Sequence, residues 1–354
     1  MNATTVAVDL AKSVFQIAEA DAQGRIIGSH RLTRGQFERF FANRAAGQIV
    51  MEACGSAHHW ARSLQAQGLT VRLLPPTRVR PYCARNKTDA ADCAALLRAN
   101  GDPGIREVPV KSIEQQALQA LHRTRSQWMA CRTQRINALR GFCREFGLPV
   151  AAGAKTALQA IGCLVADSAA PLPALLRPTM QALLLEIAQL QQRIAQIERE
   201  LRNVAANSLA CRLLLSIPGV GLLSATALVA AVGTDLAQFR SGRQLAAWLG
   251  LTPREHSSGS TRRLGAITRA GDRYLRTLLT HGARSVLQAA ARVQASGRQC
   301  TGLKAWALAV RQRTNQNKAT CALANKLARI CYATLRQGQP FDPERACKPT
   351  LAAS

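Results

Sequence analysis

The sequence predicts an α/β domain followed by helical domains, a mixed class of α/β plus all-α. The first hundred residues alternate short β-type runs with amphipathic helical runs. Apolar residues then recur at heptad spacing between residues 180 and 204. The remaining chain is rich in Ala, Leu and Arg and lacks the alternation typical of strands, so we expect it to be entirely helical.

The N-terminal elements follow from hydrophobic periodicity. Strands are expected at TTVAVDLAK, SVFQIAEA and IIGSHRLT, followed by a helix at RGQFERFFANRA. QIVMEAC is then a buried strand, SAHHWARSLQAQG a helix, LTVRLLP a fifth strand, and TDAADCAALLRAN a helix that ends at Gly101. A three-stranded meander followed by β-α-β-α defines a layered α/β domain, which we place at residues 1–108.

Residues 109–205 are expected to form a basic helix, a linker and a coiled coil. The helix from Ile113 to Phe146 carries six arginines, which either line a solvated face or bind nucleic acid. An Ala- and Pro-rich linker with short helices reaches Pro178. The heptad positions that follow are Met180, Leu183, Ile187, Leu190, Ile194, Ile197, Leu201 and Val204. They can pair within the chain as an antiparallel hairpin, or between chains as a coiled coil, and we favour the coiled coil.

The charge predicts a polyanionic partner. The formal net charge is +27 and the pI is about 11.1, and self-repulsion of this size opposes folding unless a polyanion offsets it. Residues 206–340 hold nineteen Lys or Arg but three acidic residues, Asp235, Glu255 and Asp272. We therefore expect a basic helical domain at residues 206–340, followed by a tail at 341–354, with nucleic acid as the partner.

Cysteine usage and hydropathy predict a cytoplasmic protein. The eleven cysteines are scattered without a C-x-x-C pair, which favours buried, reduced thiols over disulfides or zinc. The N-terminus lacks the basic-then-apolar pattern of a signal peptide, and no run of eighteen apolar residues occurs. We expect no membrane partner.

Four acidic residues stand out from their surroundings. Asp9 interrupts the apolar strand VAVDLA and Glu52 interrupts IVMEAC, where an unpaired buried carboxylate costs several kcal/mol. Asp89 and Asp92 lie three residues apart at the start of a helix, hence on one face. Either they are a helix-dipole complement and a strand-end residue, or the four carboxylates converge and bind cations. Oxygen ligands suit Mg²⁺, or Mn²⁺, and a pair of such ions supports phosphodiester chemistry.

The order VAVDLAK, IVMEACGSAHHWA and RNKTDAADCAAL resembles the ribonuclease-H-type, RuvC-like domain of the DEDD transposases of bacterial insertion sequences. That family includes the pilin-gene-inverting recombinase and the bridge-RNA-guided recombinases. SIPGVGLLSATALVAAVG, FRSGRQLAAWLGLTPREHSSGS and TRAGDRYLRTLL are similar to the transposase domain found downstream in the same family. The resemblance spans almost the whole chain and assigns the tetrad to Asp9, Glu52, Asp89 and Asp92.

The loop PREHSSGS offers Ser257, Ser258 and Ser260 as nucleophiles, although a Ser/Gly loop is usually only a connector. By resemblance the nucleophile is the serine before the glycine, Ser258. The family implies a covalent phosphoserine intermediate with DNA, assisted by Mg²⁺ on the tetrad of another subunit in a homodimer that assembles into a tetramer. It also implies a guide (bridge) RNA that pairs with donor and target DNA.

Several residues are candidates for phosphate contacts. Gly219 and Gly221, in IPGVG, let backbone N–H groups approach a phosphate as in a hairpin between helices, or simply form a tight turn between core helices. The basic candidates are Lys87, Arg254, Arg262, Arg263, Arg269 and Arg273.

Two other functions are compatible with parts of the pattern. A junction-resolving nuclease would use the same four acids with water as the nucleophile. A non-catalytic nucleic-acid-binding protein would retain a decayed site, although the presence of all four acids argues against it.

Overall fold

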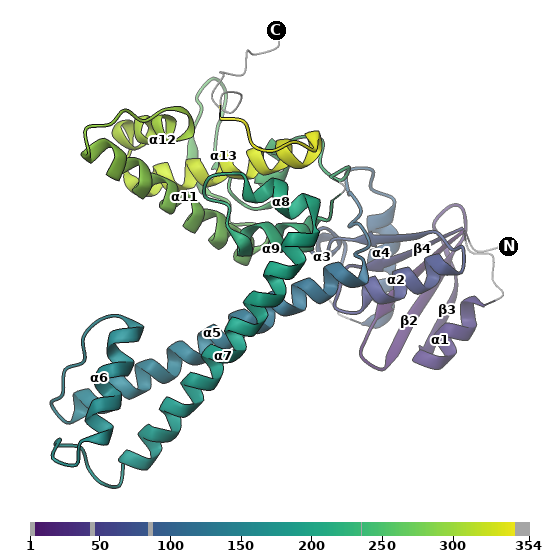
Figure 1. Cartoon of the computed structure of the whole chain (residues 1–354). Coiled ribbons are helices and arrows are strands. Elements are labelled where there is room, and N and C mark those ends of the chain that lie inside the picture. The colour runs from purple at the N-terminus through teal and green to yellow at the C-terminus, as the bar shows by residue number, and fades with distance from the viewer. Residues whose placement is uncertain (1–3, 43–46, 84–87, 235, 344–354) are drawn as a thin grey trace. The chain divides into compact units, whose positions relative to one another are not determined.

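The computed structural model describes residues 4–42, 47–83, 88–234 and 236–343. The chain divides into two compact units, Met1–Ile113 and Glu114–Ser354 (Figure 1). Each unit is described by itself.

The first unit is an α/β layer domain. All five strands and all three helices predicted for this region are present, and a short turn of helix before the last of them was not predicted. The elements are β1 (Thr5–Leu10), β2 (Val14–Ala20), β3 (Ile26–Thr33), α1 (Arg34–Phe41), β4 (Gln48–Glu52), α2 (Ala57–Ala66), β5 (Val71–Leu74), α3 (Pro76–Val79), a 3-10 turn (Arg80–Tyr82) and α4 (Asp89–Asn100).

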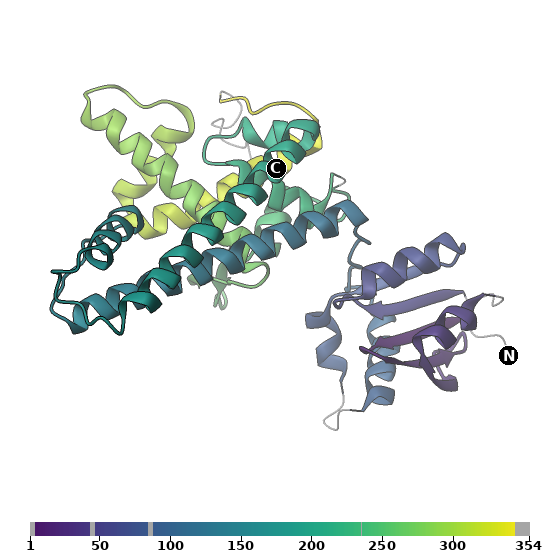
Figure 2. The ribbon, with the colours of Figure 1, turned by 60° about the horizontal axis from the view of Figure 1, so that its bottom comes forward.

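The five strands form one mixed sheet in the order β3-β2-β1-β4-β5. β1, the central strand, pairs antiparallel with β2 and parallel with β4, so β1 and β4 run in the same direction. Alternate residues of each strand face opposite ways. Val6, Val8 and Met51 pack with Trp60 of α2 on one face, whereas Ala7 and Val50 pack with α4 on the other. Figure 2 shows helices on both sides of the sheet.

The second unit contains nine helices and two short strands within its described residues. They are α5 (Ile113–Glu145), α6 (Ala154–Ala166), α7 (Arg177–Asn207), α8 (Leu209–Leu215), α9 (Leu222–Val232), α10 (Gly242–Trp248), β6 (Pro253–Glu255), β7 (Leu264–Ile267), α11 (Arg273–Ala295), α12 (Gly302–Arg313) and α13 (Gln316–Gln337).

The heptad helix α7 packs against α5 of the same chain, and the two run side by side in both views (Figures 1 and 2). Met180 and Ile187 are buried with residues near the end of α5, while Ile197 and Leu201 are buried with Leu118 near its start. The pair is therefore antiparallel. Two ion pairs join the helices, Arg125 to Glu198 at 2.7 Å and Arg135 to Glu186 at 2.6 Å.

The expectation that this seam forms an intermolecular coiled coil is therefore wrong for the seam residues. Six of the eight heptad positions are at most 7% exposed within one chain, namely Met180, Ile187, Leu190, Ile194, Ile197 and Leu201. Their apolar surface is already removed from water, so it supplies little driving force for a second chain. Two of the α5 arginines left open between a solvated face and nucleic-acid binding are used in the ion pairs with α7.

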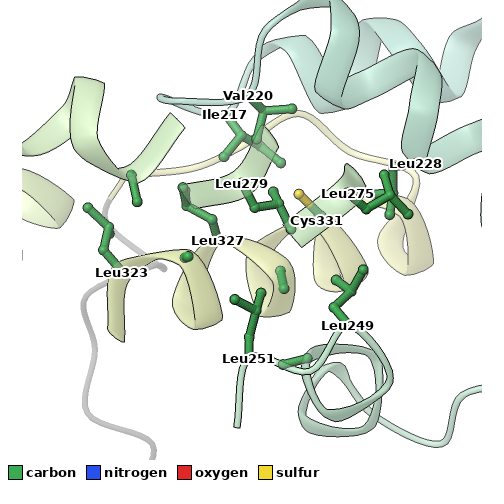
Figure 3. Packing of buried hydrophobic residues seen from close by; sticks show 14 of the residues in the cluster. Ile217, Val220, Leu228, Leu249, Leu251, Leu275, Leu279, Leu323, Leu327 and Cys331 are labelled. Carbon is green, nitrogen blue, oxygen red and sulfur yellow. The ribbon is translucent and has the colours of Figure 1, made fainter. Parts of the chain in front are cut away.

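The C-terminal helices share one apolar core. Ile217, Val220 and Leu228 meet Leu275 and Leu279 of α11 and residues of α13 (Figure 3). The segment also contains the antiparallel pair β6–β7, so the expectation of an entirely helical region is wrong there. All seven strand residues except Ile267 are exposed, which explains why no alternation of apolar and polar residues marks them.

A buried polar network fastens α5 to this core. His122 of α5 lies 3.0 Å from the hydroxyl of Thr226 and 3.1 Å from that of Tyr274. The Thr226 hydroxyl donates to the carbonyl of Leu222 at 2.7 Å, so it accepts from Nε2–H of His122, and Nδ1 accepts from Tyr274. Burial, reinforced by the charge of Arg125, lowers the pKa of His122 to about 4.

The ten described cysteines form no disulfide. Cys93, Cys143, Cys211 and Cys331 are buried as expected, but Cys83 and Cys163 are exposed, contrary to the expectation of uniformly buried thiols. Across the described helices, none is both long and apolar enough to cross a membrane.

Candidate active site

Asp9 and Glu52 end up side by side because their strands are parallel neighbours. Val8 of β1 pairs with Met51 of β4, and the next residue on each strand is the acid. Ala7 and Val50 pack on α4, and Asp9 and Glu52 lie two residues after them. Because every second residue of a strand faces the same way, both carboxylates face α4. Both side chains are half-buried. The two parallel strands thus place both carboxylates at the same edge and on the same face of the sheet.

Asp89 and Asp92 lie in the first turn of α4, which packs across that face. Thr88 caps the helix by accepting a hydrogen bond from the backbone N–H of Ala91 at 3.2 Å. The cap fixes where the helix begins, and the positive end of the helix dipole tolerates the two acids. Asp89 is exposed and Asp92 is half-buried.

A buried thiol, that of Cys93, lies next to these acids in the sequence of α4. Cys93 follows Asp92 and donates to the carbonyl of Gln16 at 3.2 Å. Burial raises the pKa of Cys93 to about 12, and the charges of Asp9, Asp92 and Asp89 add to the increase. Cys93 is thus a buried neighbour of Asp92 in α4, packed in the same cluster as Ala7 and Val50 of the sheet. Sequence reasoning did not single out Cys93, because the only signal was its position after Asp92.

Asp9 and Glu52 share a face and an edge of the sheet, and Asp89 and Asp92 lie in the first turn of the helix that packs on this face. The four carboxylates do not form a ligand shell. In the described part of the chain, no group of three or more His, Cys, Asp or Glu side chains is arranged to hold a metal ion. The donor set itself fits a hard divalent cation, because all four candidates supply carboxylate oxygens, the ligands preferred by Mg²⁺ and Mn²⁺.

Ser258 stands at the tip of the β6–β7 hairpin. Its backbone N–H donates to the carbonyl of Thr261 at 3.2 Å and its carbonyl accepts from Thr261 at 3.1 Å. Gly259 has φ +56°, so Gly259 and Ser260 form a tight turn between these partners. Ser258 and its neighbours are exposed.

The two adjacent serines differ in what their hydroxyls do. The hydroxyl of Ser257 donates to Glu255 at 2.8 Å and accepts from the backbone N–H of Arg263 at 3.1 Å. The hydroxyl of Ser258 makes no hydrogen bond to any described residue. Ser257 therefore braces the hairpin, and Ser258 presents a hydroxyl to solvent.

The hairpin is anchored at its base by close backbone contact. A Cβ on Gly250 would lie 2.0 Å from the carbonyl oxygen of Ala270, and a Cβ on Gly271 would lie 1.9 Å from that of Trp248. Only glycine allows this approach. The two arms thus leave the helical core at one fixed point, a feature that the sequence signalled only through the glycines themselves.

Five of the arginines predicted to contact phosphate lie on the hairpin or between it and the start of α11. Arg254, Arg262 and Arg263 lie on or beside the strands, Arg269 lies between the hairpin and α11, and Arg273 is the first residue of α11. All five are exposed. Arg262 lies 3.5 Å from Glu255. The other four have no carboxylate within 4 Å among the described residues. Such guanidinium groups are suited to phosphate. Lys87, also predicted to contact nucleic acid, lies outside the described residues.

Gly219 has a packing role. Its φ is +87°, and a Cβ there would lie 2.8 Å from the carbonyl oxygen of Gly282 in α11. A Cβ on Gly282 would in turn lie 1.9 Å from the carbonyl oxygen of Gly219. The tight turn between core helices accounts for this glycine. Gly221 is exposed at the start of α9, with open space beside its Cα.

Comparisons with known proteins match both halves of the chain. A family model described as "Transposase", for the DEDD type, matches residues 6–146, and a second, "Transposase IS116/IS110/IS902 family", matches residues 211–297. "Probable family 20 transposase" from Pseudomonas aeruginosa is 42% identical over 97% of this chain and 100% of its own. "Transposase for insertion sequence element IS1111A" from Coxiella burnetii is 38% identical over 94% of this chain and 90% of its own.

A more distant relative is the "Pilin gene-inverting protein" of Moraxella bovis, 33% identical over 37% of this chain and 38% of its own. Together with the acid-bearing sheet and the basic helical unit, these matches define the class: a transposase, an enzyme that cleaves and rejoins DNA. Within that class the chain belongs to the IS116/IS110/IS902 family.

Proposed function

We propose that this transposase cuts and rejoins DNA through a covalent bond between Ser258 and a backbone phosphate. The observation that carries the proposal is the hairpin tip, where the Ser258 hydroxyl is exposed and without a hydrogen-bond partner among the described residues. Exposed arginines lie on and beside the same hairpin, and the hydroxyl of the neighbouring Ser257 is engaged in hydrogen bonds that brace the turn.

The proposed step is balanced as a transesterification. The Ser258 hydroxyl oxygen bonds to phosphorus while the bond from phosphorus to one deoxyribose oxygen breaks. The serine proton passes to a carboxylate of the tetrad, and the released deoxyribose oxygen gains a proton to become a hydroxyl. Attack by the hydroxyl of another strand reverses the reaction and joins the new DNA, so no external energy source is required.

We further propose that Asp9, Glu52, Asp89 and Asp92 hold Mg²⁺, or Mn²⁺, in a RuvC-like, ribonuclease-H-type domain at residues 1–108. The sheet order and the shared face of the acids support this assignment. When bound, the ion would lower the cost of negative charge on the attacking and leaving oxygens. The carboxylates would position the ion, and the arginines on and beside the hairpin would neutralise the phosphate.

The serine belongs to residues 206–340 and the tetrad to residues 1–108, joined by residues 109–205. We propose that the site is completed between subunits of a homodimer that assembles into a tetramer. Because α7 is already buried against α5, this assembly would use surfaces other than the heptad seam.

We also propose a guide (bridge) RNA as the source of sequence choice. A net charge of +27 and an aromatic content of 4% favour contacts to phosphate backbones over stacking on bases. Sequencing the RNA that co-purifies with the protein tests this point. Recovery of one element-derived RNA supports it, and recovery of bulk cellular RNA alone contradicts it.

The covalent step is tested with labelled DNA of the cognate element and a denaturing gel. The wild type should give a protein–DNA adduct, Ser258→Ala should give neither adduct nor cut DNA, and Ser257→Ala should retain the adduct. Ser257 is a matched control because it is the adjacent serine and is also exposed. Cleavage by Ser258→Ala without an adduct would instead indicate the alternative function, a junction-resolving nuclease that uses water.

A further inference from the structure

The last three helices contain no acidic residue. Between Arg273 and Phe341 the sequence has twelve Lys or Arg and neither Asp nor Glu. The inner faces of α12 and α13 are buried in the C-terminal core through residues such as Leu303, Ala307, Leu323 and Leu327. Every charge that these helices present outward is therefore positive, and nothing on the same helices offsets it.

Where α12 meets α13, side-chain amides lie among the positively charged side chains. We define the α12–α13 turn surface by Arg311, Gln312, Arg313, Asn315, Gln316, Asn317 and Lys318. All of these are exposed except Arg311, which is half-buried. No carboxylate of the described residues lies within 4 Å of its three cations. The surface thus offers guanidinium, ammonium and amide donors without a protein acceptor for the charges.

Side-chain hydrogen bonds brace the turn between the two helices. The hydroxyl of Thr314 donates to the carbonyl of Val310 at 2.6 Å, and the side chain of Asn315 accepts from the backbone N–H of Lys318 at 2.9 Å. Farther along, the ammonium of Lys326 lies 4.5 Å from the centre of the Trp306 ring and ties α13 to α12. The donors therefore lie on the two helices, apart from Asn315, which caps the start of α13.

One helix connects this surface to the serine hairpin. The Asn325 amide of α13 donates to the carbonyl of Leu251 at 3.2 Å, two residues before β6 begins. Lys318 and Asn325 are seven residues apart, which is about 10 Å along a helix. A DNA backbone bound at the turn surface would therefore be held at a fixed offset from the base of the hairpin that carries Ser258.

We infer that the α12–α13 turn surface is a contact site for the backbone of duplex DNA, separate from the arginines on and beside the serine hairpin. The inference rests on the proposed function only in taking DNA as the substrate, and it concerns residues outside both matched family segments. Duplex DNA is the occupant because the surface has cations for phosphate and amides for groove edges. It has no aromatic side chain on which an unpaired RNA base would stack.

The test uses the full-length protein and fluorescence anisotropy with a labelled duplex of arbitrary sequence, measured over a series of salt concentrations. The triple variant Arg311→Gln, Arg313→Gln, Lys318→Gln should bind about tenfold to a hundredfold more weakly, and the slope of log K against log salt should become shallower by about 3. The charge-matched control is Arg31→Gln, Arg39→Gln, Arg80→Gln, three exposed arginines of the first unit. It should change neither quantity by a comparable amount.

A charge-retaining variant, Arg311→Lys, Arg313→Lys, Lys318→Arg, guards against misfolding and should restore binding. Equal losses in the turn variant and the control, or no loss in either, would overturn the inference. A loss of binding to single-stranded RNA with duplex binding unchanged would also overturn it, in favour of an RNA site. Failure of the proposed function looks different: the wild type would bind duplex DNA normally but form no Ser258 adduct.

Discussion

Protonation of His122 should destabilise the second unit, because both ring nitrogens are committed in the neutral form. Nε2–H donates to Thr226 and Nδ1 accepts from Tyr274, so a proton on Nδ1 breaks the second bond and places a charge in a side chain that is 3% exposed. The folded-state pKa is about 4 and the ordinary value is 6.5. The unfolded chain therefore binds more protons between these two values.

The two pKa values determine how much unfolding free energy is lost as the pH falls. Above the ordinary pKa both states are neutral and the stability is complete, and as the pH falls the unfolded state is favoured until the folded histidine also protonates. The full difference corresponds to about 3 kcal/mol of unfolding free energy, of which about 2 kcal/mol is lost by about pH 5. Urea unfolding at about pH 7.5 and about pH 5 measures this loss in the wild type and in His122→Gln.

The glutamine keeps one acceptor and one donor for Tyr274 and Thr226 but does not titrate, so the variant should lose about 2 kcal/mol less than the wild type over this range. His281→Gln, on an exposed position of α11, is the matched control and should behave as the wild type. Identical pH dependence in the wild type and His122→Gln would refute the assignment of the hydrogen-bond network.

Three further predictions concern packing and the acids. Gly282→Ala should destabilise the protein by about 1–3 kcal/mol or more through the contact with the facing turn, whereas Gly141→Ala, with open space beside it in α5, should stabilise it by about 0.5–1 kcal/mol in the same urea assay. Ile187→Ala should lower the free energy of unfolding by about 2–5 kcal/mol and leave the mass measured by light scattering unchanged. The control Leu185→Ala, at a residue that is 58% exposed, should lower it by under about 0.5 kcal/mol. Dissociation of an oligomer by Ile187→Ala would contradict the intramolecular seam. Asp9→Asn should abolish DNA cleavage while duplex binding persists, and cleavage at the wild-type rate would contradict a role for the tetrad.

The α/β unit was predictable because its strands combine local pattern with burial. β1 and β4 are apolar runs broken by a single acid each, and a parallel central pair is enough to bring Asp9 and Glu52 to the same edge. The pattern could not give the distances between the four carboxylates, because these depend on how α4 packs on the sheet.

The partner of the heptad helix could not be predicted, because an antiparallel hairpin and a coiled coil require the same a/d spacing. The deciding contacts, such as Arg125 with Glu198 and Arg135 with Glu186, join positions that are 73 and 51 residues apart in the sequence. Exposed strands were missed for a different reason: residues of β6 and β7 have no buried side that would impose an alternating pattern.

The candidate nucleophile came from resemblance alone, since three serines in a Ser/Gly loop are chemically equivalent in sequence. The structure distinguishes two of them by hydrogen bonding: Ser257 is occupied by Glu255 and Arg263, and Ser258 is not. This difference depends on the register of the hairpin, which places Ser258 opposite Thr261.

The most direct test of the central claim is to identify the residue that becomes attached to DNA. The protein is trapped on its cognate DNA, the complex is digested with nuclease and protease, and the peptides are analysed by mass spectrometry. A nucleotide phosphate attached to the hydroxyl of Ser258 is the predicted result. Attachment to a different residue, or cut DNA with no modified peptide, would contradict the proposed function.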